Sequence, residues 1–419
     1  MSQFDYQAGQ LCAEDVPLAQ IAATFSTPTF VYSRAAITGS YLAFTQAFGN
    51  KAHRVCYAVK ANSNLGVLSV LNALGASFDI VSEGELARLQ SLGIDGDRIV
   101  FSGVGKQTSE LDAALAADIA CFNVESEQEL HDLSQRAAAH NTVARISLRV
   151  NPDVDAQTHP YISTGLKENK FGVSIEDARR LYLEANEDPN LQIVGIDCHI
   201  GSQLLTMAPF LDALERVLDL VDELSREGIE FHHIDLGGGM GVQYTPDETA
   251  LDIETYASAV LQHMGNRPQE LWFEPGRSIV ANAGILLTRV INLKQNEAKR
   301  FCIIDAAMND LIRPALYQSW QGVRTITESS AESGERYDVV GPVCETGDFL
   351  AKDRQLDVRQ GDLLCIDSSG AYGFVMSSNY NSRNRAAEVL VDGTEMHLVR
   401  ERETFEYQFA LERPLPLSS

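Results

Sequence analysis

Eight short apolar runs, rich in β-branched residues, alternate with segments of helical periodicity along the first two thirds of the chain. The runs are VCYAVK (55–60), ASFDIV (76–81), RIVFSG (98–103), IACFNV (119–124), RISLRV (145–150), IVGIDCHI (193–200), HHIDLGG (232–238) and LWFEPGR (271–277). Between them, segments such as 83–92 and 210–225 repeat leucine at the spacing of one helix face. This alternation predicts an α/β fold, a TIM-like (β/α)8 barrel. A doubly wound sheet stays open, because alternation alone does not show closure.

The pattern changes after about residue 284, where short strand-like runs are separated by Gly, Asp and Asn with little helix between them. This change predicts a β-rich C-terminal domain. The run TPTFVYS (27–33) is also strand-like and lies outside the eight, so we assign it to the same domain. We therefore expect a barrel over 35–281 and a β-rich domain formed by 1–34 and 282–419.

Composition limits the possible partners. Hydrophobic residues make up 45% and charged residues 22% of the 419 residues, the balance of a globular protein. No apolar run approaches the length of a membrane helix, and the N-terminus lacks the basic start of a secretory signal. The seven cysteines form no CxxC pair, which predicts reduced thiols in a cytoplasmic protein without a structural metal. The net charge of −25 argues against nucleic acid as a partner.

Chemically unusual residues gather where the runs end. Lys60 closes the first run, and a buried ammonium is costly. The amine either reaches solvent or is covalently engaged, as Schiff-base chemistry requires. His199 ends the sixth run and is followed by Ser202. A satisfied core histidine is the plain alternative there.

The seventh and eighth runs end in GGGMG (237–241) and in Glu274, Pro275, Gly276 and Arg277. Phosphate sites of TIM barrels commonly follow these two strands, and glycine lets backbone N–H groups approach an anion. GGGMG does not fit the spacing of a dinucleotide fingerprint, and an ordinary loop remains possible. The carboxylate of Glu274 can hold a pyridine nitrogen protonated, or it can simply pair with Arg277.

Polar residues in Gly-rich loops of the second domain complete the candidate set: Arg313, Tyr317, Cys344, Glu345 and Tyr372. An acid, an arginine, a thiol and two tyrosines are more typical of a polar substrate site than of a core. Each is weak evidence alone, since a cysteine after a strand is commonly buried and inert.

Together these motifs resemble the diaminopimelate decarboxylases, a family of alanine-racemase-like (fold type III) enzymes that use pyridoxal 5'-phosphate (PLP). The resemblance also rests on VYS (31–33), FDIVSEGEL (78–86), RVNPDVDAQTHPYISTGLKENKFG (149–172) and CETGD (344–348). It implies that Lys60 is the Schiff-base lysine, that Cys344 is the proton donor and that His199 stacks on the cofactor ring. The implied cofactor contacts further include Ser202, Gly238, Gly239, Glu274, Pro275, Gly276, Arg277 and Tyr372. The implied substrate contacts are Arg277, Arg313, Tyr317, Glu345 and Tyr372.

The resemblance further implies a homodimer in which Cys344 acts in the other subunit's site. The implied reaction converts meso-2,6-diaminopimelate to L-lysine and carbon dioxide, the last step of lysine biosynthesis. Ornithine- or lysine-type decarboxylases are the nearest alternative, but their substrates end in a bare amine, whereas CETGD with RPALY (313–317) suits a distal carboxylate. A racemase fits less well, since the match runs through decarboxylase motifs. A non-catalytic PLP-binding homologue with a regulatory role also remains possible.

Overall fold

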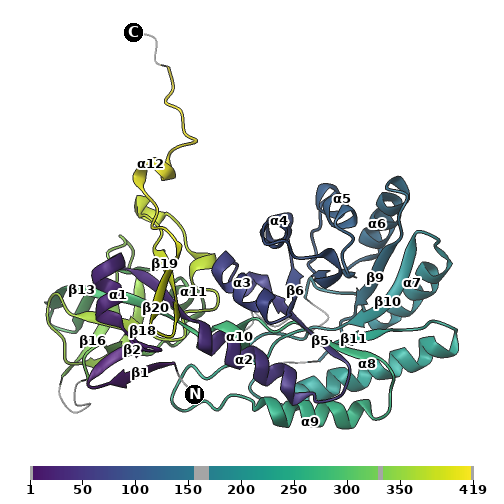
Figure 1. The fold of residues 1–419 in the computed structure, drawn as a ribbon, viewed down its shortest axis with the longest axis horizontal. Helices are drawn as coiled ribbons and strands as arrows, with labels where there is room; N and C mark the ends of the chain where they lie inside the picture. Colours follow the sequence, from purple (N-terminus) through teal and green to yellow (C-terminus); the bar gives the residue numbers. More distant parts are fainter. Residues whose placement is uncertain (1–2, 155–168, 329–333, 417–419) are drawn as a thin grey trace. The chain divides into compact units, whose positions relative to one another are not determined.

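The computed structural model describes residues 3–154, 169–328 and 334–416. The chain divides into two compact units, one of residues 37–280 and the other of residues 1–36 with 281–419 (Figure 1). Within the described ranges, none of the helices combines the length and the apolar character that crossing a bilayer demands.

The unit of residues 37–280 is a closed barrel of eight parallel strands, in the order β10-β11-β12-β5-β6-β7-β8-β9. Each of the eight predicted runs overlaps one strand of the barrel. Pairing of β12 with β5 closes the ring, so the barrel prediction is confirmed and the open doubly wound sheet is excluded. The strands are β5 (His53–Ala58), β6 (Ser77–Ile80), β7 (Ile99–Phe101), β8 (Cys121–Val124), β9 (Ala144–Arg149), β10 (Leu191–Asp197), β11 (His233–Asp235) and β12 (Glu270–Phe273).

Helices follow the strands and surround the barrel, as Figure 1 shows. Several begin at a side-chain cap: the Ser82 and Ser126 hydroxyls accept from the backbone N–H three residues later at 3.3 and 3.2 Å. The helix after β6 buries Leu86 and Leu89 toward the barrel, the face that the leucine spacing predicts. The helices are α2 (Arg34–Ala47), α3 (Leu65–Ala73), α4 (Glu83–Ser91), α5 (Thr108–Ala116), α6 (Glu127–Ala139), α7 (Ile175–Glu187), α8 (Ala208–Arg226), α9 (Ile253–Met264) and α10 (Arg277–Val280).

Aromatic side chains fill the layer between β12 and the helices outside it. The ring centroids of Phe48 and Phe273 lie 4.4 Å apart, and Phe44 meets Phe273 edge-on at 5.4 Å. Tyr256 of α9 packs edge-on against Phe48. Buried aromatic pairs of this kind contribute about 0.5–1.5 kcal/mol beyond their area burial. They fix the wall of the barrel from which the residues after β12 emerge.

The second unit is built around a nine-stranded sheet whose main path runs β17-β16-β14-β13-β4-β19-β20, with β18 pairing β13 and β15. The N-terminal β4 lies between β13 and β19, where Val31, Ile285 and Val389 pack in one apolar cluster. Its strands are β1 (Phe4–Gln7), β2 (Gln10–Ala13), β3 (Val16–Pro17), β4 (Thr29–Ser33), β13 (Gly284–Gln295), β14 (Arg300–Ile304), β15 (Val323–Thr325), β16 (Glu335–Val340), β17 (Phe349–Leu356), β18 (Leu363–Ile366), β19 (Ala387–Asp392) and β20 (Glu395–Arg400). Its short helices are α1 (Leu18–Phe25), α11 (Arg313–Tyr317), η3 (Phe374–Met376), η4 (Tyr380–Ser382) and α12 (Phe405–Gln408).

Candidate active site

A ring of buried polar side chains lies at the C-terminal ends of the barrel strands. Arg149, Asp197 and Asp235 are the last residues of β9, β10 and β11, and the strand register sets Asp197 beside both of the others. Asp79, the third residue of β6, is fully buried as well. Active sites of TIM barrels form at this end, so the ring marks the candidate site.

Lys60 lies just above this ring. It does not end a strand, as the sequence suggested, but belongs to a 3-10 turn, η1 (Val59–Ala61), that follows β5. Its side chain is 37% exposed, and its Nζ donates to Asp79 Oδ2 at 2.5 Å. The amine is therefore held by a buried carboxylate while it still reaches solvent, which suits a nucleophile that must meet an incoming carbonyl.

Three carboxyl groups crowd the centre of the ring. One carboxyl oxygen from each of Asp197, Asp235 and Glu274 lies within 4.8 Å of the other two, and all three residues are buried. Burial raises the pKa of Asp197 to about 7 and raises the pKa values of Asp235 and Glu274 well above their usual range. The neighbouring acids raise the pKa of Glu274 further, so protons are shared within the cluster.

Arg149 compensates part of this negative charge. Its Nη1 lies 3.2 Å from Glu125 Oε1, and its Nε lies 4.0 Å from Asp197 Oδ2. Its guanidinium also lies over the ring of Phe171, 4.8 Å from the centroid. This buried cation is the reason that the Asp197 carboxyl keeps a lower pKa than burial alone would give it.

Glu274 follows β12 directly and is held at a defined position. Its Oε1 accepts from Asn123 Nδ2 at 3.0 Å and from Ser102 Oγ at 3.3 Å. Asn123 is fixed in turn, because its Oδ1 accepts from Ser147 on the next strand. One amide donor and one hydroxyl donor thus orient the carboxyl group of Glu274, which the sequence singled out.

His199 is locked against the glycine loop. The Gly238 N–H donates to His199 Nδ1 at 3.0 Å, so the proton of the neutral ring sits on Nε2. Burial holds the pKa of His199 well below its usual value, and the ring is therefore neutral. A Cβ atom on Gly238 would lie 2.3 Å from the Glu274 carbonyl oxygen, so only glycine lets the two loops approach this closely.

Donors for an anion converge beside this loop. Arg277 is buried, and its Nη2 donates to Ser202 Oγ at 2.9 Å while its Nη1 donates to Tyr244 Oη at 2.8 Å. The backbone N–H groups of Gly239 and Gly276 donate to no acceptor within the described part of the chain. Pro275 supplies a carbonyl that accepts from Ala58 N–H at 3.1 Å and ties this loop to β5.

The candidate residues of the β-rich unit form a separate group. Cys344 is exposed, and its N–H donates to Asn381 Oδ1 at 3.0 Å. Glu345 accepts from Tyr380 Oη at 2.6 Å.

Three further candidates lie in this unit: Arg313, Tyr317 and Tyr372. Arg313 is buried and Tyr317 half-buried on α11. Tyr372 is half-buried and has a left-handed backbone with φ 55°. Of the motif 149–172, residues 155–168 lie outside the described residues.

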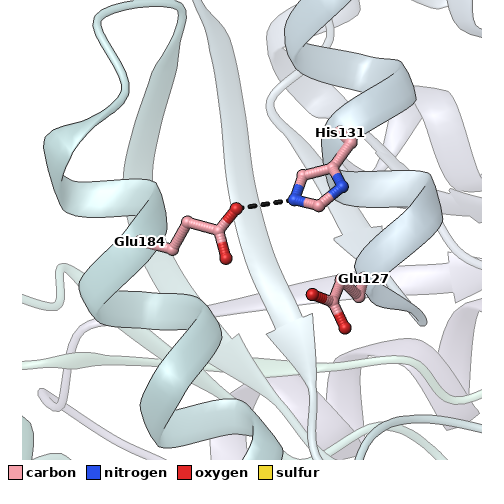
Figure 2. Close-up of side chains that lie close together, drawn as sticks. All are labelled: Glu127, His131 and Glu184. Atoms are coloured by element: carbon pink, nitrogen blue, oxygen red, sulfur yellow. Dashed lines mark hydrogen bonds and ion pairs between the residues drawn. The ribbon is translucent and has the colours of Figure 1, made fainter.

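A group of side chains that could bind a metal ion lies outside the barrel, on α6 and α7. It consists of Glu127, His131 and Glu184, and His131 Nε2 lies 2.6 Å from Glu184 Oε1 (Figure 2). Arg180 binds both oxygens of Glu127 at 2.8 and 2.9 Å and holds the pKa of that carboxyl below its usual value. Glu127 is thus already neutralised by a guanidinium. We interpret the group as an ion-pair network between two helices.

The sequence did not single out several members of the polar ring: Asp79, Ser102, Asn123, Arg149, Asp197 and Asp235. A signal for each of them existed. All six lie inside the strand-like runs, where a polar residue among apolar neighbours marks either a functional group or an error of assignment. The run pattern alone could not show which of them face the barrel axis.

Known proteins resemble the chain closely along its length. Residues 34–281 match the family model described as "Pyridoxal-dependent decarboxylase, pyridoxal binding domain". The diaminopimelate decarboxylase of Pseudomonas aeruginosa is 58% identical over 99% of this chain and 100% of the relative. The diaminopimelate decarboxylase of Vibrio cholerae is 56% identical over 99% of this chain and 100% of the relative. The structure of the Helicobacter pylori diaminopimelate decarboxylase complexed with L-lysine superposes with a TM-score of 0.91 at 42% identity, covering 94% of this chain and 98% of that one. The chain therefore belongs to the diaminopimelate decarboxylase family of PLP-dependent carboxy-lyases.

Proposed function

We propose that this protein decarboxylates meso-2,6-diaminopimelate at its D-centre and releases L-lysine and carbon dioxide. The observation that carries the proposal is the barrel mouth, where an amine, an anion cradle and a buried carboxyl group meet in one unit. Relatives that share more than half of its residues over their whole length are named for this reaction, and one related structure holds L-lysine, its product.

The residues at the mouth fit PLP by their chemistry. Lys60 offers an amine for the aldehyde, and Glu274 offers a carboxyl group for the ring nitrogen. The phosphate suits Arg277 and Ser202 together with the two backbone N–H groups, at Gly239 and Gly276, that donate to no described residue. The glycine loop leaves no room for side chains there, as a cradle for an anion requires.

Bound PLP supplies an electron sink for the pair that remains when carbon dioxide leaves. Burial and the neighbouring acids raise the pKa of Glu274, so this carboxyl can bring a proton to the ring nitrogen, and the carboxylate that remains would stabilise the protonated nitrogen. Asn123 and Ser102 keep its Oε1 in place. His199, neutral and fixed by Gly238, offers a flat face on which the cofactor ring can stack without adding positive charge.

The β-rich unit supplies the remaining functions in this proposal. The Cys344 thiol gives a proton to the α-carbon after carbon dioxide has left, and it does so in the site of a second subunit. Its exposure on its own chain is consistent with that role. Glu345 binds the distal ammonium of the substrate, while Arg277 and Arg313 bind the distal carboxylate. Tyr317 and Tyr372 complete the contacts, Tyr372 to both phosphate and substrate.

We place this reaction in the cytoplasm. All seven cysteines are free thiols, the state expected in a reducing compartment.

The test of the function is direct: incubate the protein with PLP and meso-diaminopimelate, and measure L-lysine, with ornithine and lysine as competing substrates. Release of L-lysine from diaminopimelate alone is the expected result. Amine products from ornithine or lysine, or no product from any of the three, would overturn the proposal.

A further inference from the structure

The C-terminal arm, residues 404–416, exposes an unusual amount of apolar surface. Five of its side chains, Phe405, Tyr407, Phe409, Leu411 and Leu415, are between 52% and 94% exposed. No other stretch of similar length in the described ranges exposes as many large apolar side chains. Figure 1 shows that α12 and the chain after it extend away from the strands of the β-rich unit. Single exposed apolar residues are ordinary, but a contiguous row marks an interaction surface.

The base of the arm is fixed to the loop 379–385, which also contacts Cys344 and Glu345. Glu403 is buried and accepts from Asn379 Nδ2 and Arg385 Nε, both at 2.6 Å. Between those two residues, Tyr380 binds Glu345 and Asn381 accepts from the Cys344 N–H. One loop, 379–385, therefore holds both the arm and the thiol in place. Whatever molecule meets Cys344 is also within reach of the arm, since an extended chain spans up to about 3.5 Å per residue.

The barrel carries a matching apolar rim. Leu65 is the first residue of α3, which follows β5, and Val81 and Val104 lie in the loops after β6 and β7; each is between 38% and 40% exposed. These loops surround the end of the barrel at which Lys60 and Asp79 lie. A thiol that enters this mouth from another molecule would bring its own arm to this rim.

We infer that the C-terminal arm docks on a second copy of this chain, against the apolar rim formed by Leu65, Val81 and Val104. The inference rests on the proposed function, because it uses the role of Cys344 in a partner's site. The arm and the thiol then arrive together, and the arm holds the thiol at the partner's mouth. Burial of four or five large apolar side chains is the driving force.

Photo-crosslinking tests the docking partner directly in the holoprotein. Benzoylphenylalanine is placed at Phe409, and the labelled chain is mixed with an isotopically heavy copy. The expected product joins the arm of one copy to a peptide of the other that contains Leu65, Val81 or Val104. A crosslink within one chain, or to another region of the partner, overturns the inference. The same probe at Leu183, an exposed residue of α7, is the control and should give no crosslink to the arm of a second copy.

Dissociation of the dimer provides the second test. In the arm variant, Phe405, Tyr407, Phe409 and Leu411 are replaced by serine; in the control variant, Val143 and Leu183 are replaced. Sedimentation of the PLP-loaded proteins should show a dimer dissociation constant about 100-fold or more higher for the arm variant. The control should match the unmodified protein. An unchanged constant in the arm variant overturns the inference and leaves the proposed decarboxylation intact.

Two further outcomes separate this inference from the proposed function. If the unmodified protein is monomeric and yet forms lysine from diaminopimelate, the arm inference and the shared site fall while the decarboxylase activity stands. If the protein is a dimer with the expected crosslink but forms no lysine, the docking stands as a structural finding and the proposed function falls.

Discussion

Replacing Asp197 by asparagine should remove a pH-dependent destabilisation of the barrel. Burial raises the pKa of Asp197 from its usual 3.8 to about 7. A folded carboxyl that binds its proton more tightly than the unfolded one favours folding below the unfolded pKa. That contribution is lost as the pH rises from about 4 to about 7. The full loss corresponds to about 4 kcal/mol, and the part of it between pH 5 and pH 8 to about 3 kcal/mol.

Asparagine keeps the volume of the side chain and never ionises. The free energy of unfolding of Asp197→Asn, relative to the unmodified protein, should therefore increase by about 3 kcal/mol between pH 5 and pH 8. The chain has two tryptophans, Trp272 in β12 and Trp320 in the β-rich unit. In a Trp320→Phe background, fluorescence during urea unfolding reports the barrel alone.

The control is Asp212→Asn, which changes an exposed acid of α8 and should leave the pH dependence unaltered. The reasoning is refuted if the stability difference between Asp197→Asn and the unmodified barrel is the same at pH 5 and pH 8. A difference that shrinks with rising pH would mean that Arg149 stabilises the ionised carboxylate more than burial destabilises it.

Further changes test the mouth of the barrel and the β-rich unit. Lys60→Ala should abolish turnover and the yellow absorbance of lysine-bound PLP; turnover at the original rate would remove Lys60 from the mechanism. Gly238→Ala should weaken PLP binding at least about tenfold, measured by titration, because the new Cβ would lie 2.3 Å from the Glu274 carbonyl oxygen. Arg313→Ala should raise KM for diaminopimelate far more than the Kd of PLP, and equal effects would argue for general damage. Lys60→Ala protein mixed with Cys344→Ala protein should regain part of the activity, whereas no recovery after proven subunit exchange contradicts a shared site.

The barrel could be predicted because each of its strands leaves a strong local signal. Runs such as RISLRV and IVGIDCHI are short, β-branched and bounded by turns, and each overlaps one observed strand. Closure could not be predicted, since it depends on pairing between β5 and β12, which are more than 200 residues apart. Boundaries also shifted slightly: β5 ends at Ala58, so Lys60 lies on the turn after the strand.

The polar ring could not be predicted from the sequence, because a barrel strand is buried on both faces and its residues show no clear alternation of polar and apolar side chains. Asp79 and Arg149 were visible inside the runs FDIV and SLRV, but their direction depends on register. Lys60, Glu274 and Cys344 were accessible to sequence reasoning because they close runs or sit in Gly-rich motifs. Their partners were not, since the pairing of Lys60 with Asp79 and of Glu274 with Asn123 arises only when distant strands become neighbours.

The buried acids connect the stability of the barrel to its chemistry. Burial raises the pKa values of Asp197 and Asp235, so both destabilise the barrel when they ionise. Their negative charge, with that of Asp79, also raises the pKa of Glu274. A core of the same volume without these acids would be more stable and would leave Glu274 ionised at a lower pH. The extra stability expected of Asp197→Asn therefore has a chemical cost, because it removes negative charge that favours a proton between Glu274 and the cofactor nitrogen in our proposal.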